Sequence, residues 1–253
     1  MFVITRFYFK NLLLIIGFTL FVSACRQIKK EDKRTVFRYN ESQGISTLDP
    51  AFARSQVIIW AVNHMYNGLV QLNDSLEIVP CIAREWNISD NGMLLTFMLR
   101  KDVYFHDHFI FENGKGRKVL AGDFEYSFNR ILDEKTASPG TWIFAMVDND
   151  SGDGFRALND SIFQIRLKQP FPAFPGILAM QYCSVVPKEV VEYYGNDFGR
   201  NPVGSGPFYF KYWKDGEKLI LRRNQHYFEK DDKGNKLPYL DAVAISFVKD
   251  KQS

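Results

Sequence analysis

The chain has 253 residues, with 32 Lys and Arg against 29 Asp and Glu and a formal net charge of +3. This near balance gives no sign of the clustered basic face that a nucleic-acid-binding protein needs, so that class is excluded. The 15% of aromatic residues, with 23 Phe among them, supply ample material for the core of one large domain or two small ones.

The first residues have the order of an export signal. Arg6 and Lys10 precede an almost wholly apolar stretch over 12–22, and small residues follow directly before Cys25. The apolar stretch is too short to span a bilayer comfortably, so residues 1–24 are predicted to be a signal peptide. A cysteine at this place resembles the bacterial lipobox, which predicts that Cys25 is the mature N-terminus and carries lipid. A short membrane anchor followed by an incidental cysteine is the alternative.

A polar stretch links this leader to the first predicted strand. Residues 26–34 read RQIKKEDKR and contain one apolar residue, so 25–35 are predicted to be a charged, solvated tether. Apolar spacing then predicts a strand over 36–39 and an amphipathic helix that Ser55 caps and Gly68 ends.

Further elements follow without a regular strand–helix–strand rhythm. Phe124, Phe128 and Ile131 are predicted to face inward from a helix over 123–132. β-branched and aromatic residues predict further strands over 94–99, 103–105, 162–167, 218–222 and 242–248. This mixture of short elements predicts a discontinuous α/β lobe rather than a nucleotide-binding sheet.

Two segments contain residue types that can bind metal ions. His106 and His108 would share one face of a strand, but no further ligand stands at a suitable spacing, so a turn with histidines at its edges is expected. Residues 148–160 resemble a calcium loop but lack its final bidentate Glu, so an acidic surface hairpin is expected. No pair of carboxylates is singled out for acid–base chemistry. The sequence therefore predicts no metal, no cofactor and no enzyme.

The segment NPVGSGPFYF, residues 201–210, places two glycines around Ser205. The spacing does not match a nucleophile elbow, a dinucleotide fingerprint or a phosphate loop. What remains is an extended segment after Pro207, in which Gly204 and Gly206 let bare backbone approach another chain or a ligand closely. A simple turn is the alternative.

Apart from Cys25, the cysteines are Cys81 and Cys183. In an extracytoplasmic protein such a pair could form a disulfide, and two buried free thiols fit the sequence equally well.

Several blocks together resemble one family. Residues 82–107 contain IAREWNISDNGMLLTFMLRKDVYFHD, a signature block with an Ala, a Trp, an alternating strand and a Phe-His-Asp end. The other blocks stand in the expected order at 48–70, 121–139, 158–174, 184–190 and 201–210. The chain is thus similar, from about residue 36 onward, to the extracytoplasmic solute-binding proteins of the oligopeptide, dipeptide and nickel type (family 5), which serve ABC importers.

The resemblance implies an α/β fold of the type II periplasmic-binding-protein class, with two lobes that close around a ligand at a hinge. It assigns 36–55 and 183–253 to part of the first lobe, which has a mixed sheet, and 56–182 to an extra α/β subdomain. The second lobe is expected to be missing. A longer charged loop over 111–120 departs from the family pattern.

The function implied is a lipid-anchored binding component of an ABC importer, located outside the cytoplasm and held to the membrane through Cys25. Its expected partners are a solute, foremost an oligopeptide or dipeptide, and the permease subunits. An adhesion or signalling lipoprotein with the same fold, or an inactive truncated remnant, stays open as an alternative. The residues expected to line the cleft are Gly44, Ile45, Ser46, Thr47, Leu48, Tyr182, Cys183, Gly204, Ser205 and Gly206. For Tyr182, a place in the core is the alternative.

Overall fold

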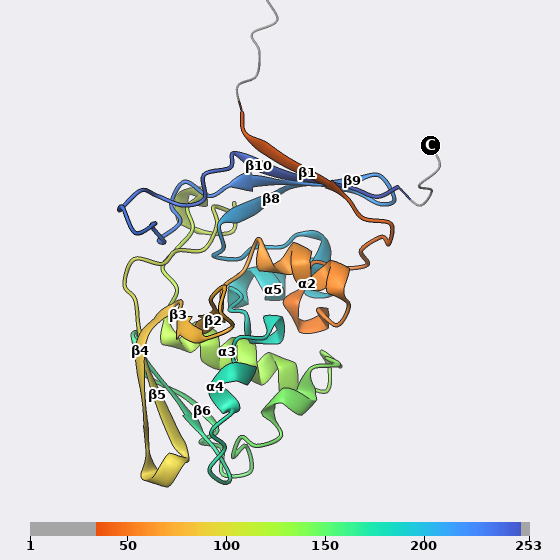
Figure 1. Ribbon diagram of the computed structural model, residues 1–253. Helices are drawn as coiled ribbons and strands as arrows, with labels where there is room; N and C mark the ends of the chain where they lie inside the picture. The colour runs from red at the N-terminus through yellow and green to blue at the C-terminus, as the bar shows by residue number, and fades with distance from the viewer. Residues whose placement is uncertain (1–33, 249–253) are drawn as a thin grey trace, which may run out of the picture. The chain divides into compact units, whose positions relative to one another are not determined.

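A mixed four-stranded sheet forms one end of the part that the computed structural model describes, residues 34–248 (Figure 1). Its strands, in spatial order, are β1 (Val36–Asn40), β10 (Ala242–Ser246), β9 (Lys218–Arg223) and β8 (Phe208–Lys214). Strand β1 runs parallel to β10, with Val36 opposite Ala242, and the other neighbours are antiparallel. The first and last strands along the chain therefore lie side by side.

A second four-stranded sheet is antiparallel throughout. Its strands, in spatial order, are β4 (Ala83–Ser89), β5 (Leu94–Leu99), β7 (Ile162–Arg166) and β6 (Phe155–Asn159). A short hairpin of β2 (Val70–Leu72) and β3 (Ile78–Pro80) precedes it.

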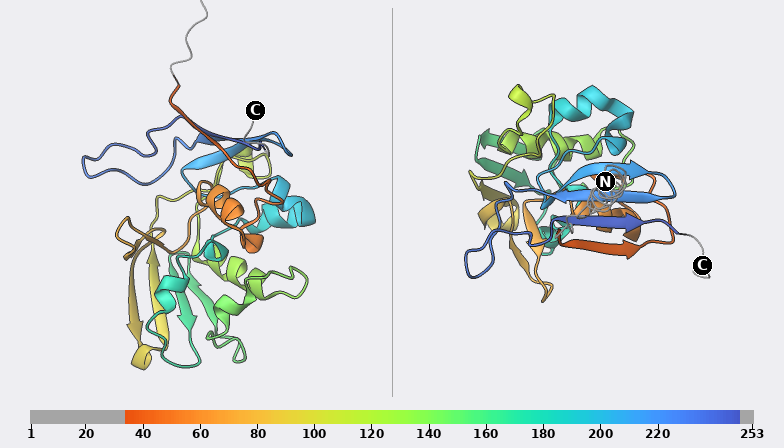
Figure 2. Two further views of the ribbon diagram at one scale, coloured as in Figure 1. Left: turned by 45° about the vertical axis from the view of Figure 1, so that its right-hand side comes forward. Right: turned by 90° about the horizontal axis from the view of Figure 1, so that it is seen from above.

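Helices connect and cover the two sheets. The α-helices are α2 (Gln56–Asn63), α3 (Ala121–Leu132), α4 (Phe174–Ile177) and α5 (Lys188–Tyr194). The 3-10 helices are Pro50–Phe52, Asp90–Gly92, Glu112–Gly114, Thr141–Phe144, Gln181–Cys183 and Gly195–Arg200. Helices α2 and α5 lie between the two sheets in both side views (Figures 1 and 2), and α3 packs on β6 and β7.

The phenylalanines gather in the core between α3 and the second sheet. Phe128 lies at the centre of this cluster, with its ring centroid 4.9 Å from that of Phe144 and 5.3 Å from that of Phe155. Phe124 and Phe163 complete the cluster, and both are fully buried. The high Phe content therefore serves the core, as aromatic residues with large buried areas commonly do.

The mixed α/β fold class is confirmed, and most predicted elements lie within a few residues of their observed bounds. The strand expected over 103–105 is wrong: Val103 and Phe105 are buried, but only Tyr104 makes an isolated bridge, to Lys118. Residues 103–105 do bond to a neighbouring segment: the N–H of Phe105 donates to the carbonyl of Arg117, and the N–H of Val119 donates to the carbonyl of Val103, each at 3.0 Å. The pairing ends after this one bridge, so no strand ladder forms.

The helix after Ser55 is shorter than expected, because it ends at Asn63 rather than near Gly68. The carbonyls of His64 and Met65 accept hydrogen bonds from the backbone of Phe208 and Gly206, at 2.9 and 2.8 Å. These tertiary bonds replace the next helical turn.

The acidic segment before β6 and the two cysteines of the described part can be compared with their predictions. Residues 148–153 form exposed turns that lead into β6, which pairs with β7 as a hairpin. Cys81 and Cys183 are both free and buried, so the disulfide alternative is wrong for this pair.

The described residues from Thr35 onward form one compact unit. All strands of the first sheet come from the segments assigned to the lobe, and all strands of the second come from the segment assigned to the subdomain. The exact boundaries at 55 and 183 stay a prediction. Within residues 34–248, no helix combines the length and apolar character required to cross a bilayer. The predicted leader, Cys25 and most of the tether lie outside the described residues.

Candidate functional site

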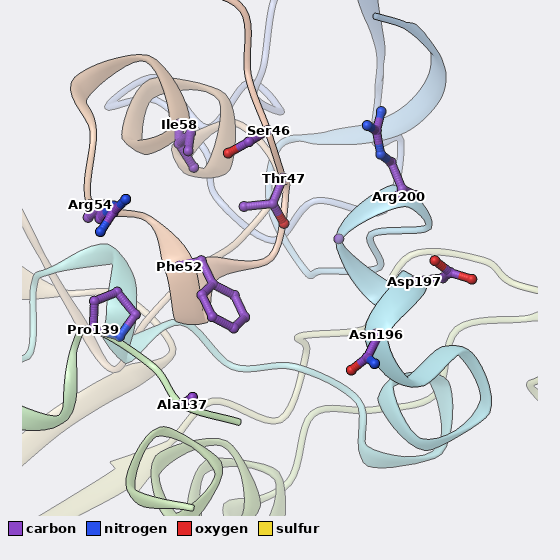
Figure 3. Close-up of a pocket in the computed structure, with 11 residues that line it drawn as sticks. Ser46, Thr47, Phe52, Arg54, Ile58, Ala137, Pro139, Asn196, Asp197 and Arg200 are labelled. Carbon is purple, nitrogen blue, oxygen red and sulfur yellow. The ribbon is translucent and has the colours of Figure 1, made fainter. Parts of the chain in front are cut away.

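An open pocket of about 550 Å³ lies where the loop after β1 meets the start of α2 (Figure 3). Its lining residues are Ser46, Thr47, Phe52, Arg54, Ile58, Ala137, Pro139, Asn196, Asp197, Gly199 and Arg200. They combine hydroxyl and amide groups with aromatic and aliphatic surface, which is the usual composition of a small-molecule or peptide site.

The loop that carries Ser46 and Thr47 is fixed against the 3-10 helix Gly195–Arg200. The backbone N–H of Leu48 donates to the carbonyl of Gly199 at 2.9 Å, and the Thr47 hydroxyl accepts from the N–H of Asp49 at 3.1 Å. A Cβ on Gly199 would lie 2.1 Å from the Thr47 hydroxyl oxygen, so a larger residue here would force the Thr47 side chain to move. Two walls of the pocket are therefore joined at this contact.

A buried ion pair supports the pocket from below. Arg130 of α3 donates to both carboxylate oxygens of Asp49, at 2.6 and 3.0 Å, and the two side chains are 12% and 5% exposed. Burial lowers the pKa of Arg130, but the hydrogen bonds to Asp49 outweigh it and raise that pKa overall. Asp49 also accepts from the N–H of Ala51 at 2.9 Å, which caps the 3-10 helix Pro50–Phe52. The pair fixes the segment that presents Phe52 to the pocket.

The charged residues of the pocket differ in how they are paired. Arg200 donates to both oxygens of Asp215, at 2.6 and 2.9 Å, and its guanidinium lies 3.8 Å from the centre of the Trp213 ring. Arg54 and Asp197 are exposed, and neither has an ion-pair partner among residues 34–248. Among the described residues, the pocket thus offers one cation and one carboxylate that have no ion-pair partner.

The residues predicted to line the cleft divide into two groups. Ser46 and Thr47 line the pocket, and Gly44 is exposed on the same loop. The others are buried against the chain itself: Ile45, Leu48, Tyr182, Cys183, Gly204, Ser205 and Gly206. The assignment of Gly44, Ser46 and Thr47 to a ligand cleft stays a prediction.

Gly204 and Gly206 have a structural use that the sequence did not reveal. Their backbone packs directly on Met65, just after α2: a Cβ would lie 2.1 Å from the Met65 oxygen at Gly204 and 2.4 Å from its carbonyl carbon at Gly206. Ser205 between them is 1% exposed. The close approach of this bare backbone is therefore to the protein's own backbone, and the assignment of Gly204, Ser205 and Gly206 to a ligand cleft stays a prediction.

His106 holds the same loop from the other side. Its backbone N–H donates to the carbonyl of Gly204 at 2.7 Å, and its Nδ1 accepts from the N–H of Gly204 at 3.3 Å. Nε2 must then carry the proton and donates to the carbonyl of Gly206 at 2.9 Å. Burial lowers the pKa of His106 to about 4, so the ring is neutral at physiological pH. In the described part of the chain, no cluster of His, Cys, Asp and Glu is arranged to hold a metal ion.

Tyr182 is 7% exposed and lies behind the pocket, with its ring against Gly140, next to the lining residue Pro139. Burial raises the pKa of Tyr182, and the charge of Arg54 partly counters this rise. Of the lining residues that the sequence reasoning missed, Arg54 had a visible signal: it is the one charge in the otherwise uncharged stretch over 50–60.

Comparison with known proteins now assigns the family. The model of the bacterial extracellular solute-binding proteins, family 5 (middle part), matches residues 77–253. The chain belongs to this family. The expected membership is therefore confirmed, and it accounts for the order of sequence blocks over the lobe and the subdomain.

Relatives of this family 5 chain are named for different ligands. The probable deoxycholate-binding periplasmic protein YgiS of Escherichia coli is 30% identical over 206 residues, which are 76% of this chain and 37% of the relative. The periplasmic murein peptide-binding protein MppA of Escherichia coli is 30% identical over 212 residues, which are 78% of this chain and 37% of the relative. The chain thus spans well under half the length of these curated relatives.

A solved structure shares the fold. The periplasmic binding protein DppA of Helicobacter pylori, associated with an ABC transporter and in complex with the peptide STSA, superposes with a TM-score of 0.73 and 30% identity. The match covers 87% of this chain and 44% of that one. Family 5 is a family of extracellular solute-binding proteins, which fits a binding site better than a catalytic one.

Proposed function

We propose that this chain supplies the first lobe of a solute receptor for an ABC importer, and that the pocket around Ser46, Thr47, Phe52 and Arg54 is its ligand face. The observation that carries the proposal is this open, mixed polar and apolar pocket, with two unpaired charges, on a fold shared with a peptide-bound relative. The receptor captures its solute without converting it.

A peptide is the solute that the lining favours. Ser46, Thr47 and Asn196 offer hydroxyl and amide groups that can bond to the main chain of an extended peptide, and Phe52 and Ile58 offer apolar surface for its side chains. Main-chain bonds hold a peptide whatever its sequence, so such a receptor tolerates many peptides. A bile acid, the ligand in the name of YgiS, would use the apolar surface but leave most of these polar groups unpaired.

The binding proposal is tested by calorimetric titration of the protein, as its gene encodes it, with short peptides. Ser46→Trp should fill the pocket and abolish binding. Ser42→Trp is the matched control, because Ser42 is exposed on the same loop and does not line the pocket. Absence of binding to every peptide, or equal affinity in both variants, would contradict the proposal. Mass spectrometry of the incubated peptides separates capture from hydrolysis.

The proposed anchor is lipid on Cys25, outside the described residues, joined to the lobe by the charged tether. A Cys25→Ser variant expressed in bacteria should lose incorporation of labelled palmitate and move from the membrane to the soluble fraction. Cys81→Ser is the control, since Cys81 is a buried free thiol. Equal labelling of the wild type and of Cys25→Ser would refute the anchor.

A further inference from the structure

We infer that Arg54 makes the receptor selective for solutes that carry a carboxylate on a side chain, namely peptides with Asp or Glu. The inference deepens the proposed function and rests on it. It assigns a specificity-determining role to the Arg54 side chain. The other polar groups of the pocket are suited to bonds with a peptide main chain, and these bonds do not distinguish one peptide sequence from another.

The charge of Arg54 is not neutralised by an ion pair within the described part of the chain. Other arginines of this region are paired: Arg130 with Asp49, and Arg200 with Asp215. Arg54 is exposed, lines the pocket and lies in none of the ion pairs of residues 34–248. A guanidinium offers fork-shaped donors that match a carboxylate in two parallel hydrogen bonds. The site therefore has a free donor of the right shape for an acidic side chain.

The surface beside Arg54 is partly apolar. Phe52, Ile58 and Pro139 line the same pocket, so a carboxylate that reaches the exposed Arg54 has a partly apolar wall beside it, which removes part of the surrounding water. Electrostatic attraction is stronger where water is excluded. Helix α2 begins just beyond Arg54, and its N-terminal end adds partial positive charge of the same sign.

The two charges without an ion-pair partner also orient a bound solute. Arg54 and Asp197 lie on opposite sides of Phe52 in Figure 3. Asp197 is likewise exposed and without an ion-pair partner in residues 34–248. It repels an acidic side chain from its own side of the pocket, and a basic group of the solute is favoured there. The two free charges thus place an acidic side chain at Arg54 rather than elsewhere in the pocket.

The test uses alanine tetrapeptides that carry Glu, Gln or Lys at one position, with every position sampled. The wild-type protein should bind the best Glu peptide about threefold to tenfold more tightly than its Gln counterpart, and this ratio should fall with added salt. Arg54→Gln should remove the preference while Gln peptides still bind. Arg54→Glu should reverse it, so that Lys peptides bind more tightly than Glu peptides. Arg156→Glu, an exposed charge reversal on β6, is the control and should keep the wild-type order.

The outcomes distinguish a failure of the proposed peptide binding from a failure of the proposed selectivity. If no peptide binds the wild type, the proposed function fails and this inference falls with it. If peptides bind but Glu and Gln peptides bind equally, or if Arg54→Glu keeps the preference for Glu, the inference is overturned and peptide capture stands. Circular dichroism of each variant, with Arg54→Gln as the milder change, excludes misfolding as the cause of a lost preference.

Discussion

Replacement of Gly206 by alanine separates a structural role of the glycine pair from a ligand-binding role. In the structure, the Gly206 backbone lies on Met65 and leaves no room for a side chain. We therefore expect Gly206→Ala to destabilise the fold. If bare backbone at Gly206 served only a ligand, the same change would lower affinity and leave stability unaltered.

The size of the destabilisation by Gly206→Ala can be estimated from the distance between the new Cβ and Met65. Carbon atoms in contact lie about 3.5–4.0 Å apart, whereas a Cβ on Gly206 would lie 2.4 Å from the carbonyl carbon of Met65. The clashing atoms are backbone, so no rotamer change relieves the overlap. Overpacking costs about 1–3 kcal/mol, and loss of the hydrogen bond from Gly206 to Met65 adds about 1 kcal/mol. The free energy of unfolding should therefore fall by about 2–4 kcal/mol.

Urea unfolding followed by far-ultraviolet circular dichroism measures this change. With a denaturant slope of about 2 kcal/mol per M, the midpoint should fall by about 1–2 M. Gly44→Ala is the matched control, because a Cβ on Gly44 meets nothing within 4 Å. Its stability should stay the same or rise slightly, since alanine restricts the unfolded chain. Equal midpoints for the two variants would refute the packing argument.

The other predictions concern charged and titratable groups in the core. The pKa of His106 is about 4 in the folded protein and about 6.5 in the unfolded chain, so the unfolded state binds a proton first as the pH falls. The contribution of neutral His106 to the free energy of unfolding is therefore complete above pH 6.5 and is lost as the pH falls toward 4. This loss should amount to about 3 kcal/mol. In His106→Asn, the free energy of unfolding should depend less steeply on pH over the same range. Equal slopes of this free energy against pH in the variant and the wild type would contradict the prediction. Arg130→Met should cost about 3–5 kcal/mol in urea unfolding because it leaves Asp49 buried and unpaired, whereas Arg156→Met, in an exposed pair, should cost less than about 1 kcal/mol. Similar costs for the two arginines would show that burial of the Asp49 pair does not matter.

The spacing of apolar residues in the sequence is sufficient to predict strands and helices in which one face is buried. In β5 (Leu94–Leu99) the buried residues Leu95, Phe97 and Leu99 alternate with half-buried ones, and the strand was predicted with its observed bounds. The same reasoning failed for 103–105, where Val103 and Phe105 are buried and bond to residues 117–119 but the pairing is a single isolated bridge. Alternation reports burial, whereas a strand also needs a neighbour that stays paired with it over several residues, and this is a property of the whole fold.

The site could be predicted only where its residues stand close together in the sequence. Ser46 and Thr47 were found on the loop after the first strand, and Arg54 could have been found as an isolated charge. Asn196 and Asp197 come from a distant 3-10 helix that reaches the pocket through the bond from Leu48 to Gly199. No local pattern indicates such a meeting of distant segments.

The glycine pair shows why a local motif leaves its partner undetermined. Bare backbone at Gly206 is compatible with a ligand or with another part of the chain, and the partner Met65 lies far away in sequence. The contact also reaches the pocket, because α2 contributes Ile58 to the lining and is bonded just beyond its end to the segment that enters β8. A substitution at Gly206 that loosens this contact would therefore shift a wall of the pocket as well. Loss of peptide affinity in such a variant is evidence of direct ligand contact only if its unfolding midpoint equals that of the wild type.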